Sequence, residues 1–213
     1  MTTARQVTAP VLLIGNAPVE AARNGAAALA PAARAVVRIN DAFGFGGVHG
    51  ERTSHLVLVN CGGSMRERLE NPARLFTPAL RAAERVILPI APQTDDLRVP
   101  PVPPAARLAP DARNYAPEAS ARLEAANKRV ATLPARFFAA AARAAGHERL
   151  APDTPPPSTG LIALVWLLEA YPAAPIHCFG FAFEGWEGHA WAAERAFFAR
   201  QAEAGRVRLH AVA

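Results

Sequence analysis

Cysteine is scarce in this chain of 213 residues, which contains only Cys61 and Cys178. The two lie far apart, and neither belongs to a Cys-x-x-Cys pair or to a Cys/His spacing of the kind that holds zinc. We therefore expect no structural metal site. So low a count is typical of proteins in a reducing compartment, which predicts a cytoplasmic location.

Lysine is rarer still, since Lys128 is the single lysine among 23 basic residues, and the arginines form no basic run. The formal net charge of +5 at pH 7 is compatible with anionic partners. Charges scattered in this way do not predict a nucleic-acid partner.

A long hydrophobic run is also missing. The apolar stretch at residues 11–14 is too short for the core of a signal peptide or for a membrane span. The stretch at residues 161–168 is bounded by Gly160 and Glu169, and it indicates a buried core helix. We expect no membrane span, and the 51% apolar content is ample for one packed core.

The signatures of common nucleotide sites are absent as well. No Gly-x-Gly-x-x-Gly follows the first apolar run, and the glycines within residues 44–47 lack its spacing. No Gly-Lys-Ser/Thr ending marks a phosphate-binding loop, and no Asp-x-Asp occurs for a nucleotide-bound metal. These absences count against the interpretation that the chain is a redox protein with a dinucleotide site.

What the chain does contain is a series of short apolar runs that alternate with helix-like segments. The predicted strands span residues 11–14, 35–41, 55–60, 85–90, 175–181 and 206–212. The predicted helices span residues 20–30, 71–84, 119–130, 134–146 and 188–205, with one more that starts near Leu161. This alternation predicts a single Rossmann-like α/β domain over residues 1–213, with a mostly parallel sheet flanked by helices. Residues 91–118 are rich in proline, and we expect a loop or lid insertion there rather than a second domain.

Glycine and asparagine gather directly after the predicted strands. In an open α/β sheet, ligands bind beyond the carboxyl ends of the strands, where this chain has Gly15, Asn16, Asn40 and Gly180. Asn16 can cap the helix that follows, which is the commonest use of asparagine there, or hold a nucleotide with its amide. Asn40 can likewise be a simple turn former.

Two later segments carry further candidates. Ser158, Thr159 and Gly160 stand at the predicted start of the apolar helix, where free amides and the helix dipole favour an anion. An ordinary helix cap is the other interpretation. His189 and Glu194 are either a general base and its neighbouring acid, or a surface histidine and a solvated glutamate. Five positions span about 140° on a regular helix, so direct pairing requires His189 to lie outside the helix.

Four stretches, in this order, resemble the sialyltransferases of glycosyltransferase family 29, and specifically a bacterial soluble-type member. "VLLIGNAP" with "VVRINDA" is similar to the large sialylmotif, whose end is similar to "GERTSHLVLVN". "PSTGLIALVWLLEAYPAAPIHCFGF" resembles the small sialylmotif, and "HAWAAE" resembles the very small motif. The likeness covers most of the chain except residues 89–154.

The resemblance implies a GT-A-like variant of the α/β fold and an inverting transfer of sialic acid, or a related nonulosonate, to a glycan acceptor. The donor would be a CMP-sugar, with no metal or other cofactor. His189 would be the base that deprotonates the acceptor hydroxyl, and Glu194 would support it. The residues that it places at the donor are Gly15, Asn16, Asn40, Ser158, Thr159, Gly160 and Gly180.

The chain departs from the family in three respects. We expect no membrane anchor of the kind that animal members usually carry, and the two cysteines do not match the family's disulfide pair. The segment "AFEGWEG" lacks the His-Tyr motif that usually precedes the very small motif. The alternative hypothesis is therefore a non-catalytic accessory protein that keeps the fold and binds a nucleotide.

Overall fold

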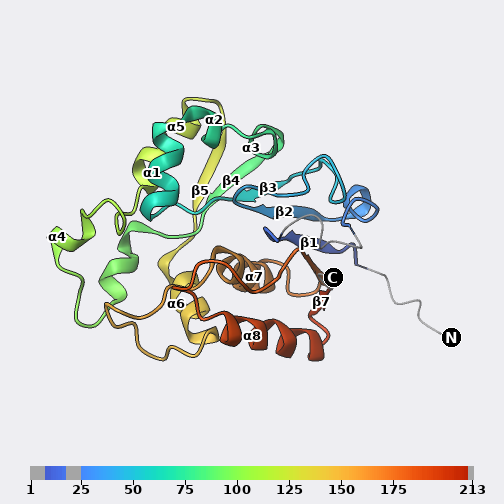
Figure 1. The fold of residues 1–213 in the computed structure, drawn as a ribbon. Helices are drawn as coiled ribbons and strands as arrows, with labels where there is room; N and C mark the ends of the chain where they lie inside the picture. The colour runs from blue at the N-terminus through green and yellow to red at the C-terminus, as the bar shows by residue number, and fades with distance from the viewer. Residues whose placement is uncertain (1–7, 18–24, 211–213) are drawn as a thin grey trace.

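The computed structural model describes residues 8–17 and 25–210. A seven-stranded sheet runs through these residues, and all six strand pairs in it are parallel. The prediction of a parallel α/β fold is confirmed (Figure 1). The strands are β1 (Val11–Ile14), β2 (Ala35–Ile39), β3 (His55–Val57), β4 (Arg85–Leu88), β5 (Arg129–Thr132), β6 (Ile176–Phe179) and β7 (Val207–Leu209).

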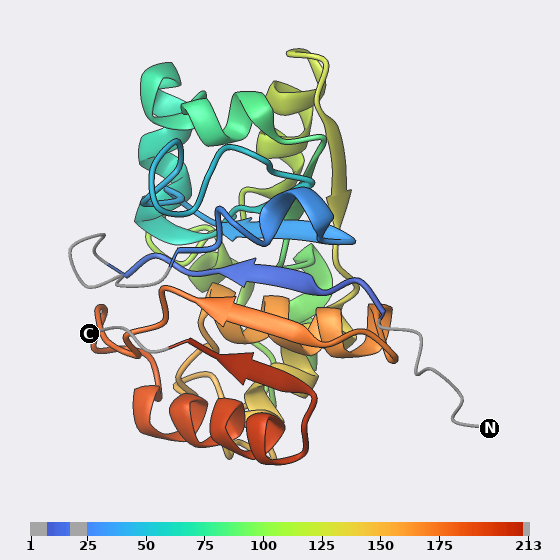
Figure 2. The same ribbon diagram turned by 90° about the vertical axis from the view of Figure 1, so that its right-hand side faces the viewer.

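The strand order is β5-β4-β3-β2-β1-β6-β7, so the sheet grows in both directions from β1. Leu13 of β1 is in register with Val37 of β2 on one side and with Cys178 of β6 on the other. Figure 2 shows β2, β1, β6 and β7 side by side with their arrows pointing the same way. The direction of winding reverses between β1 and β6, and this is where open α/β sheets bind ligands.

Helices cover both faces of the sheet (Figure 1). Helices α6, α7 and α8 pack on one face, and α1, α2, α3 and α5 on the other. The α-helices are α1 (Gly62–Glu70), α2 (Pro72–Leu75), α3 (Pro78–Ala82), α4 (Pro104–Arg107), α5 (Ala116–Glu124), α6 (Ala135–Ala144), α7 (Thr159–Ala170) and α8 (Trp191–Glu203), and the 3₁₀ helices are η2 (Ala30–Ala32) and η3 (Pro92–Leu97).

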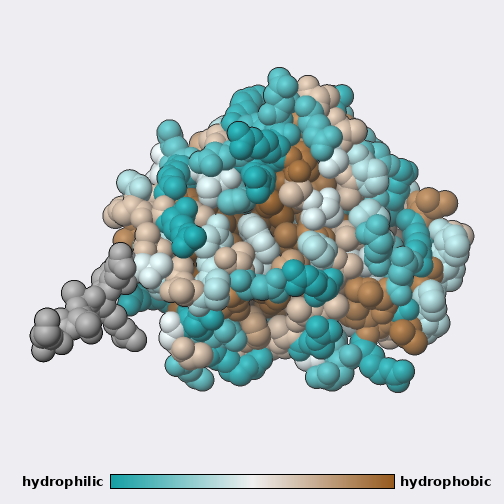
Figure 3. Space-filling model, turned by 180° about the vertical axis from the view of Figure 1, so that it is seen from behind, coloured by the Kyte–Doolittle hydropathy of each residue, from teal (hydrophilic) through white to brown (hydrophobic). Residues whose placement is uncertain are grey.

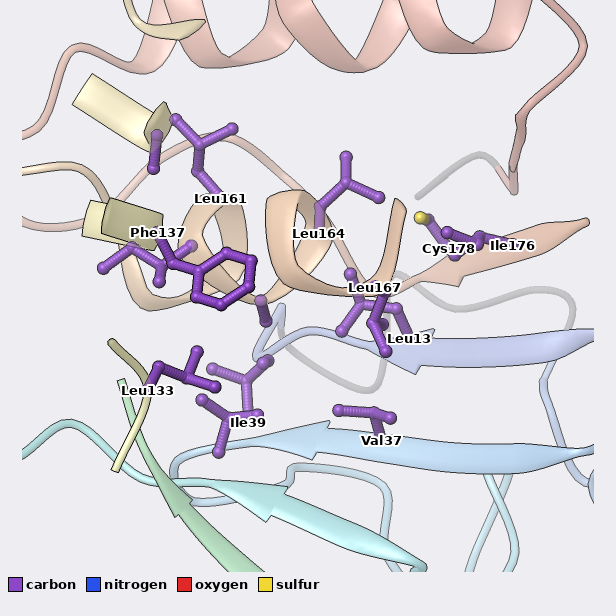
Figure 4. Close-up of a cluster of buried hydrophobic side chains, with 14 of the residues drawn as sticks. Leu13, Val37, Ile39, Leu133, Phe137, Leu161, Leu164, Leu167, Ile176 and Cys178 are labelled. Atoms are coloured by element: carbon purple, nitrogen blue, oxygen red, sulfur yellow. The ribbon is translucent and has the colours of Figure 1, made fainter. Parts of the chain in front are cut away.

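Alternate residues of each strand face opposite layers, as the two-residue period of a β-strand requires. Val11 and Leu13 belong to the cluster under α6, α7 and α8, whereas Leu12 and Ile14 face the opposite side. Figure 4 shows Leu161, Leu164 and Leu167 of α7 packed in the first cluster. Each such buried leucine contributes roughly 1.5–3 kcal/mol. The layer therefore fixes α7 firmly against the centre of the sheet.

The six predicted strands are present in the described residues, and each of the later five is shorter than predicted. Asn40 and Gly180, which fall within the predicted strands, instead follow β2 and β6 and line the site described below.

One strand was assigned wrongly to a helix. The helix predicted over residues 119–130 ends at Glu124, and residues 129–132 form β5. The chain reverses at Asn127, whose φ of 58° is left-handed. β5 pairs only with β4 and is partly exposed, so it lacks the continuous apolar run that marks a buried strand.

Three helical segments also differ from the prediction. Residues 71–84 form α2 and α3 rather than one helix, because Pro72 and Pro78 each stand at a helix start. The nine-residue α1 was not predicted. The predicted helix at residues 20–30 lies partly outside the described residues, and of its described part only Ala30, the first residue of η2, is helical.

The middle segment, residues 91–118, contains η3, α4 and the start of α5, with irregular chain between them. It exposes Leu97, Val99 and Leu108. Seen from behind, the surface is largely hydrophilic, and hydrophobic residues gather toward its right-hand and lower right side (Figure 3).

Candidate functional site

A cavity of about 370 Å³ lies at the carboxyl ends of β1, β2 and β6. It occupies the reversal point of the sheet, between the loops that follow these strands and the starts of α7 and α8. All nine residues singled out from the sequence line it: Gly15, Asn16, Asn40, Ser158, Thr159, Gly160, Gly180, His189 and Glu194.

Gly15 and Gly180 lie where β1 and β6 come closest. The Gly15 amide donates to the Phe179 carbonyl (2.8 Å), and a Cβ atom at Gly15 would lie 2.4 Å from the Gly180 oxygen. Gly180 has a φ of 67°, a conformation that favours glycine. The close packing of the strand ends and the backbone conformation therefore explain why glycine stands at both positions, whether or not a ligand also contacts them.

The two asparagines join neighbouring loops. Asn16 Oδ1 accepts a hydrogen bond from the Phe43 amide (3.3 Å), and Asn40 Oδ1 accepts one from the Val59 amide (2.8 Å). Asn40 has a φ of 49°, so it forms a left-handed turn at the end of β2, as the turn interpretation required. Residues that Asn16 would cap as a helix lie outside those described.

Helix α7 begins at the cavity. Ser158 is its N-cap, and Ser158 Oγ accepts from the Leu161 amide (3.1 Å). The amides of Thr159 and Gly160 donate to no protein group among the described residues, because the first turn of a helix has no partners for them. Two free donors and the positive end of the helix dipole thus face one cavity, which suits an anionic ligand.

Glu194, in the first turn of α8, fixes the start of α7 through hydrogen bonds with Ser158. Its carboxylate accepts from the Ser158 amide (2.8 Å) and from Ser158 Oγ (2.5 Å), and it is 1% exposed. Burial raises the pKa of this carboxyl, while the hydrogen bonds from Ser158 and the nearby His189 act in the opposite direction. Glu194 is therefore a positioning residue for α7, and it forms no hydrogen bond with His189.

His189 lies outside α8, which begins at Trp191. Its Nδ1 is 2.8 Å from the Pro156 carbonyl oxygen. A carbonyl can only accept, so Nδ1 carries the hydrogen and neutral His189 has its lone pair on Nε2. The ring lies edge-on to Trp186 and Trp191, at centroid distances of 4.8 and 4.9 Å. This tautomer is the one that a general base with its free nitrogen at Nε2 needs.

Residues that the sequence did not single out also shape the first cavity. Phe181 and Phe183 line it, and the Phe181 ring packs so close to Gly160 that a Cβ there would lie 2.8 Å away. Both follow β6 in "GFAFEGW", a run of aromatic residues directly after a strand end, and this was the signal available.

Arg38 supports the site from the other face of the sheet. Its guanidinium is fully buried and donates to the carbonyls of His49 (2.8 Å) and Gly50 (2.6 Å) and to Thr53 Oγ1 (2.9 Å). Burial lowers the pKa of Arg38 to about 10. The "VVRIND" and "GERTSH" stretches are therefore one hydrogen-bonded unit that fixes the chain on either side of Asn40.

A second cavity of about 630 Å³ adjoins the first, and Asn40, Thr159 and His189 line both. Its other walls come largely from α1 and from the middle segment, including Asp95, Arg98 and Asn114. Its lining mixes carboxylate, guanidinium, amide and aromatic groups, which is a wall suited to a polar ligand with hydroxyl groups.

Metal ligands do not gather in the described part of the chain: no three His, Cys, Asp or Glu side chains there form a metal-binding group. Cys61 and Cys178 are free thiols. No helix within residues 8–17 and 25–210 is both long and apolar enough to cross a bilayer.

No protein-family model matches the chain, and no curated protein has a significantly similar sequence. Two of the solved structures with a similar fold are sialyltransferases. One is a mammalian sialyltransferase, with a TM-score of 0.57 at 16% identity. The other is a mammalian sialyltransferase in complex with Gal-beta-1-3GalNAc-ortho-nitrophenol, with a TM-score of 0.53 at 15% identity. Each match covers 96% of this chain and 70% of the other. The parallel α/β fold is thus that of these sialyltransferases.

Proposed function

We propose that this protein is a glycosyltransferase that moves sialic acid, or a related nonulosonate, from a CMP-sugar to a hydroxyl of a glycan acceptor. The transfer inverts the anomeric centre and uses no metal. One observation carries the proposal: nine residues chosen from separate stretches of sequence line a single cavity at the reversal point of the sheet. The sialyltransferase-like fold supports it. A bacterial source and a cytoplasmic location stay predictions from the sequence.

The donor occupies the first cavity in this proposal. Its phosphate lies against the free amides of Thr159 and Gly160, and its nucleotide lies along Gly15, Asn16 and Asn40. These amides are held in place before the donor arrives, because Glu194 and Ser158 fix the start of α7. Fixed donors of this kind stabilise charge on a leaving group without reorganising during the reaction.

The acceptor approaches through the second cavity, and His189 lies between the two. The acceptor oxygen attacks the anomeric carbon while its proton passes to His189 Nε2. The bond from the anomeric carbon to the phosphate oxygen breaks, and CMP leaves with the bonding electrons. The transition state is oxocarbenium-like, as in glycoside hydrolysis, so negative charge builds at the helix start. Base assistance contributes roughly 10²–10⁴-fold.

A second candidate is a non-catalytic protein that binds the nucleotide. The observation that favours it is the segment of residues 182–188, which contains no histidine or tyrosine to assist the departing phosphate. This candidate predicts CMP binding without CMP release from any mixture of donor and acceptor.

Two measurements test the proposal. Calorimetric titration with CMP, and with UMP as the control nucleotide, should show binding that prefers CMP. CMP-sialic acid mixed with a glycan acceptor should release CMP. The change His189→Ala should lower transfer by about 10²-fold or more, while CMP binding stays within a factor of a few. His147→Ala, outside both cavities, is the matched control and should leave both unchanged. Absence of any response to CMP or CMP-sugars would overturn the proposal.

A further inference from the structure

The turn after β2 holds Asn40 at the place where the two cavities meet, since Asn40 lines both. Its Oδ1 accepts from the Val59 amide (2.8 Å), whereas its Nδ2 donates to no protein acceptor among the residues described. The side chain is thus held by its oxygen, and its two N–H groups are left for a ligand. How well Asn40 serves a ligand therefore depends on how firmly this turn is fixed.

The backbone of the turn is strained. Asn40 has a φ of 49° and Ala42 a φ of 52°, both in the left-handed region. Asparagine tolerates this region, but alanine rarely adopts it, and such a residue persists only where its surroundings hold it there. Backbone bonds supply part of the restraint, since the Asn40 amide donates to the Val57 carbonyl (2.9 Å) and the Ala42 amide to the Ile39 carbonyl (3.0 Å). Asp41, between the two strained residues, adds a side-chain restraint.

Asp41 is joined to helix α1 by an ion pair. Its Oδ1 accepts from Arg68 Nη2 at 2.6 Å, and this is the only ion pair of either residue in the described part of the chain. The Arg68 side chain is 8% exposed, and its Nη1 donates to the Ser64 carbonyl (3.1 Å). A buried guanidinium held at two points has a fixed position, and its charge-assisted bond to a short side chain fixes the backbone of Asp41 in turn.

We propose that Asp41 and Arg68 are positioning residues for Asn40. Their ion pair holds the strained turn and so keeps the Asn40 amide in place at the junction of the two cavities. Neither side chain lines either cavity, so each acts on a ligand through Asn40. The identity of the ligand, CMP, rests on the proposed function, whereas the restraint on the turn does not.

Hydrogen exchange tests the restraint on the turn without any ligand. The Val59 amide is protected by its bond to Asn40. The adjacent Leu58 amide donates instead to the Ile87 carbonyl (2.9 Å), so it reports on the sheet alone. Comparison of the two amides therefore separates a loosened turn from a general loss of stability.

Arg68→Met is the first variant, because it removes the buried charge at similar volume and leaves the partly exposed Asp41 to be solvated. Exchange at Val59 should become about tenfold faster or more, while exchange at Leu58 stays within about twofold. Asp41→Ala breaks the same pair from the other side and should accelerate Val59 likewise. Arg66→Met breaks a different ion pair of the same helix and should change neither amide. Equal acceleration of both amides by Arg68→Met, or no acceleration of Val59, overturns the proposal.

Nucleotide binding is the second test, and it separates positioning from a general effect on the fold. Arg68→Met should raise the Kd for CMP about three- to tenfold. Asn40→Gly removes the side chain and fits the left-handed backbone. In that background Arg68→Met should change the Kd by less than about twofold, because no amide is left to position. A change by the same factor in both backgrounds contradicts the proposal.

The two proposals fail in different ways. If the unchanged protein does not bind CMP, the proposed function is refuted, while exchange at Val59 still supports or overturns the positioning role. If Asn40→Gly weakens CMP binding and Arg68→Met does not, the positioning role is refuted and the transferase stands.

Discussion

Gly15, which lines the first cavity, is required by the packing of the strands. Gly15 sits at the end of β1, in the middle of the sheet, and its neighbour across the strands is the backbone of Gly180. Backbone in a central sheet cannot move aside as a flexible side chain can. From sequence, glycine after a strand indicates only that something comes close. Whether that is a ligand or another strand depends on a residue 165 positions away, which no local pattern contains.

Gly15→Ala should destabilise the protein by about 1–3 kcal/mol or more, because the added methyl group overlaps the Gly180 oxygen. Gly47→Ala is the matched control, since a Cβ there would meet only the Gly44 oxygen at 3.7 Å, an ordinary contact. Urea denaturation measures both. A change at Gly15 as small as the change at Gly47 would contradict the steric account.

Helices α7 and α8 are joined at their starts through Ser158 and Glu194. The pair lies 36 residues apart in sequence and is buried, so its hydrogen bonds are protected from water. Removing either partner leaves the other buried without its usual bonds, which is costly. Removing both costs less than the sum of the two changes.

Ser158→Ala should lower the free energy of unfolding by about 1–3 kcal/mol, through loss of the helix cap and of the bond to Glu194. Combined with Glu194→Ala in a double-mutant cycle, it should give a coupling of about 0.5–3 kcal/mol. Ser158→Thr keeps the hydroxyl and should retain most of the stability. Additive single effects would mean that the two helices are not linked in this way.

Elements with strong local signals could be predicted from sequence, and those with weak signals could not. β1 and β6 are buried on both faces; β1 is a continuous apolar run, and β6 is apolar except for His177. β5 is an edge strand that contains both polar and apolar residues. Its local sequence therefore fits a helix as well as a strand. α1 begins at Gly62 and Gly63, which are poor helix formers, and tertiary packing overrides that weak propensity.

Four histidines connect the stability of the protein to pH. Burial lowers the pKa of His49, His55, His177 and His210 below 6.5. The folded state then binds fewer protons than the unfolded state as the pH falls through 6.5, so stability decreases in that direction. The raised pKa of Glu194 acts the opposite way, since it favours the folded state as the pH falls toward 4.5. The effect of the four histidines on stability therefore outweighs the opposite effect of the one carboxyl.

Tm should therefore be lower at about pH 5.5 than at about pH 7.5. His177 and His210 lie with their ring nitrogens 3.2 Å apart and cannot both be charged without repulsion. The double change His177→Gln and His210→Gln should reduce the pH dependence measured by differential scanning calorimetry. A Tm that is flat over this range in the unchanged protein would contradict the prediction.

The first cavity could be predicted largely from the sequence, and the second cavity could not. Strand-end residues and helix starts gather at one edge of a parallel sheet by topology alone, so nine residues of the first cavity could be named from sequence. The second cavity depends on how residues 91–115 fold back over α1, held by Asn60, which bonds Ile90 and Asn114. Such contacts have no local period, and for this reason the walls of the second cavity that come from this segment could not be predicted from sequence.

The position of β6 beside β1 bears on how this protein is made. The chain that leaves the ribosome first supplies β1 to β5, but the partner of the second edge of β1 is at residues 176–179. At ~5–20 residues per second, β1 waits on the order of ten seconds with that edge open. Until α7 and β6 have been made, the nascent chain exposes an unpaired strand edge, which is a site of aggregation. That edge of β1 closes, and the first cavity is complete, only after the chain has been made through β6 and the start of α8.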